Sequence, residues 1–162
     1  MGKIWAEKLM AKESAQHARD LESLRGDLMR ETESHKIRLR KSELIFQREV
    51  EAASELVALS RHLSPQRWRP GMDWDDVCDD IASDFHLIEK ELRAFLAKHG
   101  AVLPGGVKDD LGWCIAIAGE GKFEVGETGV PGGANTEADQ LIKKLWDVEN
   151  DLISHVRSQT SV

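Results

Sequence analysis

Long apolar runs, cysteines and prolines are all scarce in this sequence of 162 residues. No apolar run approaches the roughly eighteen residues that a bilayer-spanning helix needs, so we expect no membrane segment. The first residues lack the apolar core and the small-residue cleavage site of a signal peptide. The two cysteines, Cys78 and Cys114, lie in apolar-patterned segments, which favours buried free thiols over a disulfide. We therefore expect a cytoplasmic protein.

Sequence motifs of common catalytic and metal sites are missing as well. Phe123 stands where a phosphate-binding loop around Gly121 and Lys122 would need a serine or threonine. No histidine or cysteine pair has the spacing of zinc ligands, and no Gly-x-Ser-x-Gly marks a nucleophilic serine. We predict no catalytic residue, no metal ligand and no cofactor. Because catalytic residues can lie far apart in a sequence, an enzyme stays a weaker alternative.

Proline is absent from residues 3–64, and Gly26 is the only glycine there. The segment is rich in Ala, Leu, Glu, Lys and Arg, which are strong helix formers. It ends before Pro65, because proline disfavours helix in the residue that precedes it. The sequence thus predicts one long helix over 3–63. A kink or hairpin between 26 and 34 is the competing geometry, and no strong turn signal supports it.

The apolar pattern changes along this helix. Between 10 and 28 it follows a narrow seven-residue spacing, typical of a weak coiled-coil seam. From residue 37 onward a second apolar row joins, and such a wide face suits a helix in a globular bundle. We expect residues 3–35 to form a coiled-coil-like arm that protrudes or dimerises, and residues 36–160 to form a compact helical bundle. The positions of the seam are Met10, Ser14, His17, Leu21, Leu24 and Leu28.

A proline- and glycine-containing linker over 64–72 separates the long helix from a second one. The second helix is predicted from 74 to 99, with Asp73 as its N-cap and Gly100 as its C-terminal stop. The fold class that follows is all-α or nearly so.

The last third of the chain is predicted to hold two more helices. One is short and runs through 118, capped by Asp109 or Asp110, with a buried strand over 113–118 as the alternative. The other covers 136–158. A small β-hairpin near 119–130, in the glycine-rich stretch between them, is an option.

The net charge of −7 conceals an asymmetry, since residues 1–71 carry a net +3 and residues 72–162 a net −10. The basic segment 35–41 could contact nucleic-acid phosphates. Acidic neighbours and the lack of interleaved aromatic residues weaken that interpretation, and we favour an acidic protein partner or the chain's own acidic helix. The cations concerned are Lys36, Arg38, Arg40 and Lys41.

The acidic helix at 73–84 carries Asp76, Asp80 and Asp84 at four-residue spacing, which predicts that they share one helix face. A solvated face, favoured by the helix dipole, is the default interpretation. A contact for a basic partner is the functional one. Carboxylates on one face could also hold a metal in an enzyme of unrecognised type.

These patterns together indicate an interaction protein. We expect a non-enzymatic, oligomeric regulator or accessory subunit of a larger bacterial machine, whose partner is a protein or a second copy of the chain in a homodimer. A dimeric nucleic-acid-binding protein is the first alternative and a metal-dependent enzyme the second. Tryptophan is enriched at binding hot spots, so Trp5 joins the leucines as a contact. The predicted partner contacts are Trp5, Leu9, Leu21, Leu24 and Leu28.

Overall fold

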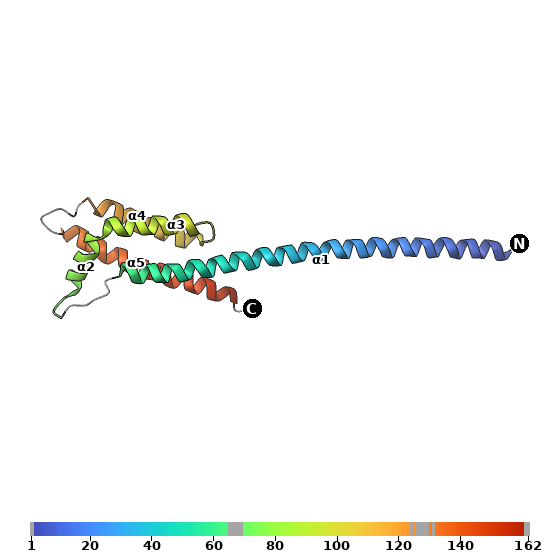
Figure 1. Cartoon of the computed structure of the whole chain (residues 1–162), viewed down its shortest axis with the longest axis horizontal. Coiled ribbons are helices and arrows are strands. Elements are labelled where there is room, and N and C mark those ends of the chain that lie inside the picture. The colour runs from blue at the N-terminus through green and yellow to red at the C-terminus, as the bar shows by residue number, and fades with distance from the viewer. Residues whose placement is uncertain (1, 65–69, 124, 126–129, 131, 161–162) are drawn as a thin grey trace. The chain divides into compact units, whose positions relative to one another are not determined.

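The computed structural model describes residues 2–64, 70–123, 125, 130 and 132–160, without the side chains of 2–7 and 9. That part of the chain contains five helices and no strand, which confirms the predicted all-α helical bundle (Figure 1). The helices are α1 (Gly2–Leu63), α2 (Trp74–Ser83), α3 (Phe85–His99), α4 (Gly105–Gly121) and α5 (Gly132–Thr160).

Residue contacts divide the chain into two compact units, Met1–Leu44 and Ile45–Val162, and α1 belongs to both. The sequence places the boundary between arm and bundle at 35/36, whereas the two observed units divide between Leu44 and Ile45. Helical backbone continues through residues 26–34 without a break, so the kink or hairpin alternative is wrong.

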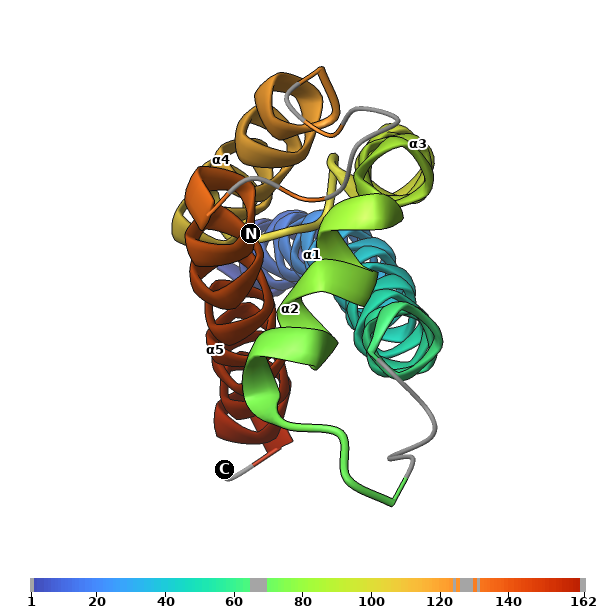
Figure 2. The ribbon, with the colours of Figure 1, turned by 90° about the vertical axis from the view of Figure 1, so that its left-hand side faces the viewer.

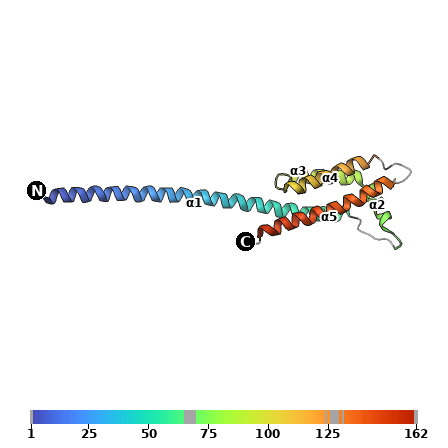
Figure 3. The same cartoon turned by 180° about the vertical axis from the view of Figure 1, so that it is seen from behind.

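In the second unit, the last part of α1 contributes buried side chains to the core that the other helices also line. Within this unit α3 packs against α4, α4 packs against α5, and α2 packs mainly against α5. Figure 2 looks along the bundle and shows α2 lying across its near end. Figure 3 shows α3 and α4 side by side from the opposite direction. The core is made almost entirely of aliphatic side chains, and its largest fully buried members include Phe85, Leu56, Ile88, Leu92, Leu111, Leu141, Ile142 and Leu145.

Burial in α1 follows a three- and four-residue spacing that only a helix can place on one side. Among the side chains of α1 that the structure describes, the buried ones are Glu49, Ala52, Ala53, Leu56, Ser60 and Leu63. Fully burying a leucine contributes about 1.5–3 kcal/mol, so this end of α1 gains its stability from the core. The helix closes at Ser64, whose backbone N–H and hydroxyl both donate to the carbonyl of Ser60, at 2.9 and 2.7 Å.

The predicted single helix over 74–99 is wrong, because Asp84 separates α2 from α3. The predicted cap is present: Asp73 accepts from the N–H of Asp76 at 2.9 Å, and Asp76 accepts from the N–H of Asp73 at 3.1 Å. The break follows Ser83, whose hydroxyl donates to the carbonyl of Asp79 at 2.8 Å. At this point the backbone tightens into a three-residue turn, in which the N–H of Asp84 donates to the carbonyl of Ile81 at 3.0 Å. The bend lets α2 face α5 while α3 faces α4.

α4 is a helix, so the strand alternative over 113–118 is wrong, and the helix is longer than predicted. Its N-cap is Pro104 rather than Asp109 or Asp110, and the Pro104 carbonyl accepts from the N–H of Lys108 at 3.1 Å. The β-hairpin predicted near 119–130 is contradicted for the described residues of that range, none of which lies in a strand. Residues 119–121 end α4, 122 and 123 form a turn, and 124 and 126–129 lie outside the described residues.

Candidate interaction surface

The first unit exposes the apolar side chains of the seam. Met10, Leu21, Leu24 and Leu28 are 63, 68, 59 and 56 % exposed. Every other described side chain between 8 and 45 is exposed as well. The helical backbone places Trp5 and Leu9 near the start of α1, but their side chains lie outside the described part of the chain. Three of the five predicted contacts are therefore placed, and all three lie on the exposed part of α1.

Helical geometry brings the seam residues onto one side of α1. Ser14, Leu21 and Leu28 recur every seven residues, and Met10, His17 and Leu24 fall between them, which corresponds to positions a and d of a heptad repeat. The pattern ends in polar residues at the next positions of the register, Glu31, His35, Arg38 and Ser42. The apolar surface is thus a stripe about two and a half heptads long.

Local ion pairs supply the intrahelical support of this segment. Arg30 pairs with Asp27 at 3.6 Å, and Lys36 pairs with Glu33 at 3.3 Å, each three residues apart. Such exposed pairs contribute about 0.2–0.5 kcal/mol each. Since helices in proteins gain most of their stability by packing an apolar face, this segment would be stabilised by a partner that covers the seam.

The basic segment lies just beyond the seam on the same helix. Lys36, Arg38, Arg40 and Lys41 are all exposed. At 100° per residue, Lys36 and Arg40 share one side of the helix while Arg38 lies on nearly the opposite side. The cations therefore surround the helix instead of forming one continuous basic face, and Lys36 already has the carboxylate of Glu33 beside it.

The acidic residues of the second unit lie along α2 and at its C-terminal cap. Asp76 and Asp80 belong to α2, whereas Asp84 lies at the junction between α2 and α3. Asp76 also accepts a hydrogen bond in the capping box of α2. All three are exposed. Their contact with a basic partner stays a prediction.

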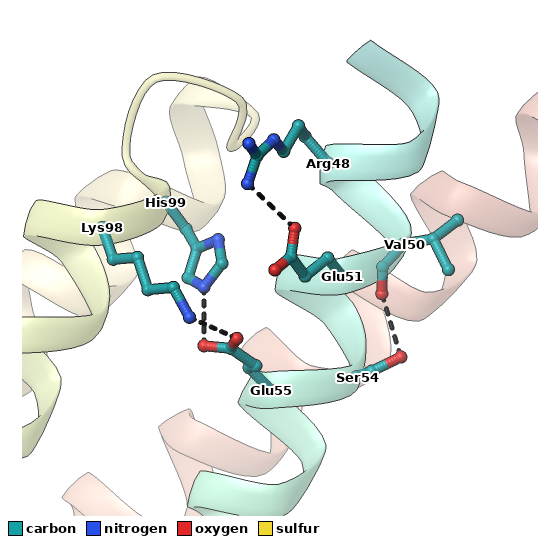
Figure 4. Close-up of polar contacts among 7 residues, drawn as sticks. All are labelled: Arg48, Val50, Glu51, Ser54, Glu55, Lys98 and His99. Carbon is teal, nitrogen blue, oxygen red and sulfur yellow. Dashed lines mark hydrogen bonds and ion pairs between the residues drawn. The ribbon is translucent and has the colours of Figure 1, made fainter. Parts of the chain in front are cut away.

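Polar contacts between helices hold the second unit together. Figure 4 shows Lys98 and His99, at the end of α3, meeting the carboxylate of Glu55 on α1. The His99 ring is buried and packs against Phe95 with ring centroids 4.9 Å apart. The Lys98 ammonium, together with His99, lowers the pKa of the Glu55 carboxyl. No local pattern predicts this cluster, because Glu55 lies more than forty residues from Lys98 and His99.

A comparable cluster joins α3 to the end of α4. Lys122 reaches Glu89, which also receives Arg93 at 2.9 Å from the same helix. The two cations lower the pKa of the Glu89 carboxyl, with Lys122 the larger influence. Between α4 and α5, Asp110 pairs with Lys144 at 2.8 Å and raises the pKa of the lysine. Each of these carboxylates is paired with a cation, so the clusters stabilise the packing of one helix against another.

The cysteines are free and buried, as the sequence predicts. Burial raises the pKa of the Cys78 thiol to about 11 and that of the Cys114 thiol to about 12. Within the described ranges, no group of three or more His, Cys, Asp or Glu side chains converges as metal ligands would. No helix there combines the length and apolar character needed to cross a membrane.

Comparison with protein-family models, curated proteins and solved structures gives no match to this chain. The fold and the surface define a helical-bundle protein with an exposed apolar seam on its first helix.

Proposed function

We propose that this chain is a non-enzymatic interaction protein, an oligomeric regulator or accessory subunit that binds a helix of its partner along the seam. The observation that carries the proposal is the exposure of Leu21, Leu24 and Leu28, each more than half exposed on one side of α1. A thin stripe of leucines at heptad spacing is the surface that a second helix covers in a coiled coil.

The energy available from the seam fits a reversible contact. A leucine or methionine contributes about 1.5–3 kcal/mol when it is fully buried, and a two-stranded seam buries it only in part. Four such side chains on each helix therefore offer roughly 8 kcal/mol before costs, and association itself costs about 4 kcal/mol or more. We expect a contact of moderate strength, of the kind that a regulatory or accessory subunit uses.

The proposal is tested by placing charge on the seam of the full-length chain. Leu21→Asp with Leu28→Asp should abolish binding, because each aspartate would be buried unpaired in the contact. Met29→Asp with Ile37→Asp is the matched control: it also puts two aspartates at exposed apolar positions of α1, away from the seam.

Two measurements test this. Sedimentation equilibrium measures self-association, and quantitative co-purification of the tagged chain from cells that express it measures binding to another protein. Binding, to self or to another protein, should be lost in the seam variant and kept in the control. Unchanged thermal unfolding of the bundle shows that both variants fold. Equal binding by wild type and seam variant in both measurements would overturn the proposal.

A further inference from the structure

We propose that the helix bound by the seam is α1 of a second copy, running parallel and in register. This inference rests on the proposed function and specifies its partner. It is carried by the charges that flank the seam, which match one orientation of two identical helices and oppose the other.

The flanking positions of the heptad repeat carry a consistent sign. With Ser14, Leu21 and Leu28 at position a, position g is acidic in three successive heptads: Glu13, Asp20 and Asp27. Position e holds Ala11, Ala18, Arg25 and Thr32. Residues at e and g border the seam and meet across it, where they set the orientation of the partner.

An antiparallel pair brings g against g and e against e. Three acidic side chains on each helix would then face three acidic side chains on the other, and Arg25 could face no carboxylate across the seam. A parallel pair brings each g residue against the e residue five positions further along the second helix. Asp20 then faces Arg25 of the second copy, and the symmetry repeats this pair on the other side of the seam.

The remaining flanking pairs of the parallel arrangement contain no repulsion. Glu13 would face Ala18, and Asp27 would face Thr32, whose hydroxyl can donate to a carboxylate. Within its own helix Asp20 accepts from Gln16 at 3.2 Å, and Asp27 pairs with Arg30 at 3.6 Å. These contacts are exposed and weak, so they do not compete strongly with a pair across the seam.

The register follows from the order of residues along the seam. In register, Leu21, Leu24 and Leu28 each meet their own counterpart, while the polar layers of Ser14 and His17 meet each other. A shift by one heptad would place Leu21 against Ser14 and Leu24 against His17. Such a shift would bury polar groups against leucine without a hydrogen-bond partner, which disfavours it. Polar layers of this kind fix the register of coiled coils.

The test reverses the charges of the matched pair in the full-length chain. Asp20→Arg would face Arg25, and Arg25→Asp would face Asp20, so each variant alone should self-associate at least tenfold more weakly than wild type. An equimolar mixture should form heterodimers as tightly as the wild-type dimer, because both pairs across the seam become attractive again. Sedimentation equilibrium at low salt measures both.

Glu22→Arg and Arg19→Asp are the controls. They change the net charge by the same amounts but occupy positions b and f, which point away from the seam. Their mixture should show no preference for heterodimers. A second readout is disulfide formation: under oxidation Ser14→Cys should link the two copies, and Ser23→Cys, at the outward position c, should not.

Restored association in the Asp20→Arg and Arg25→Asp mixture, with cross-linking through residue 14 only, supports the inference. A wild-type chain that stays monomeric at about 100 µM overturns it. The seam proposal then survives only if another protein co-purifies through Leu21 and Leu28. The parallel orientation is overturned if the chain dimerises but the mixture of Asp20→Arg and Arg25→Asp associates no more tightly than either variant alone. It is also overturned if the dimer does not cross-link through residue 14.

Discussion

Nε2 of His99 lies 2.7 Å from Oε2 of Glu55, and it joins the end of α3 to the middle of the buried stretch of α1. The other oxygen of the same carboxylate receives the ammonium group of Lys98. Figure 4 shows that Glu55 links α1 to the end of α3 through these polar contacts.

The stability of the bundle should decrease as the pH falls, and part of this decrease should come from protonation of Glu55. Because Lys98 and His99 lower the folded-state pKa of this carboxyl below its ordinary value of 4.5, the unfolded chain takes up the proton first as the pH falls. The contribution is therefore complete above about pH 4.5 and is lost as the pH drops through the folded value. Urea unfolding of wild type and Glu55→Gln between pH 7 and pH 3 measures it.

The Glu55→Gln variant should be less stable at pH 7 and should lose less stability than wild type on acidification. Glu51→Gln is the control, because the ion pair of Glu51 is with Arg48 of its own helix, at 3.1 Å. If Glu55→Gln and wild type lose stability in parallel across this range, the assigned role of Glu55 is wrong.

A side chain at residue 121 should be poorly tolerated. A Cβ added to Gly121 would meet the ring of Phe85, with Cδ2 at 2.7 Å, and Oε2 of Glu137 at 2.8 Å. Overpacking of this kind costs about 1–3 kcal/mol, so Gly121→Ala should unfold at lower denaturant concentration. Gly112→Ala, in the same helix with nothing within 4 Å of the added atom, should stabilise by about 0.5–1 kcal/mol. Equal stability of the two variants would contradict this.

The hydrogen bond between Trp74 and Asp139 should contribute to holding α2 on α5. Nε1 of Trp74 donates to Oδ1 of Asp139 at 2.8 Å, and this bond, after the larger influence of Lys143, lowers the pKa of the carboxyl. Trp74→Phe should cost about 1.5 kcal/mol, as expected for a hydrogen bond to a charged acceptor. The control is Trp113→Phe, since Trp113 is an exposed residue of α4.

A double-mutant cycle of Trp74→Phe with Asp139→Ala separates the hydrogen bond from the change in ring size. The two effects should be less than additive, with a coupling energy near that of the bond. Strict additivity would show that the bond contributes nothing.

Neither cysteine should react in the folded protein. Burial raises the pKa of Cys78 to about 11 and that of Cys114 to about 12, so both stay protonated at pH 7, and the thiolate is the reactive form. An aromatic disulfide reagent should label no thiol of the native chain within minutes and both thiols in guanidinium. Rapid labelling of the native protein would contradict the burial of one of them.

Replacing the polar layers of the seam should strengthen self-association. His17 occupies a d position in the inferred dimer, where leucine packs better. His17→Leu should lower the dissociation constant about tenfold or more, measured by sedimentation equilibrium. Arg19→Leu, on the outward side of α1, should leave it unchanged. A weaker His17→Leu dimer would contradict the placement of residue 17 in the seam.

The sequence predicted the elements whose signals are local. The lack of proline between 3 and 64 predicted α1, and Asp73, predicted as an N-cap, marks the start of α2. Other boundaries were missed because packing outweighed local preference. Gly105 and Gly106 are poor helix formers, yet they lie in the first turn of α4. The apolar stripe through 74–99 is continuous and did not predict the break at Asp84.

The candidate surface was predicted in part. Leu21, Leu24 and Leu28 were chosen from their spacing, and their exposure is what the tertiary structure added. The spacing of apolar residues did not predict the position at which the apolar face of α1 becomes buried. A second apolar row begins at residue 37, but the first buried side chain described is that of Glu49. The spacing of apolar residues identifies a helix face that can be buried, but only the tertiary structure determines which part of that face is buried.

The sequence by itself determined that this chain is helical and that its first helix is unusually long, because helix propensity and the lack of proline act within a few residues of each other. The tertiary structure alone decided which part of that helix is buried. It brought Glu55 to His99, turned α2 away from α3 at Asp84, and left the seam exposed. These outcomes depend on contacts between residues far apart in the chain, whose energies no local pattern records.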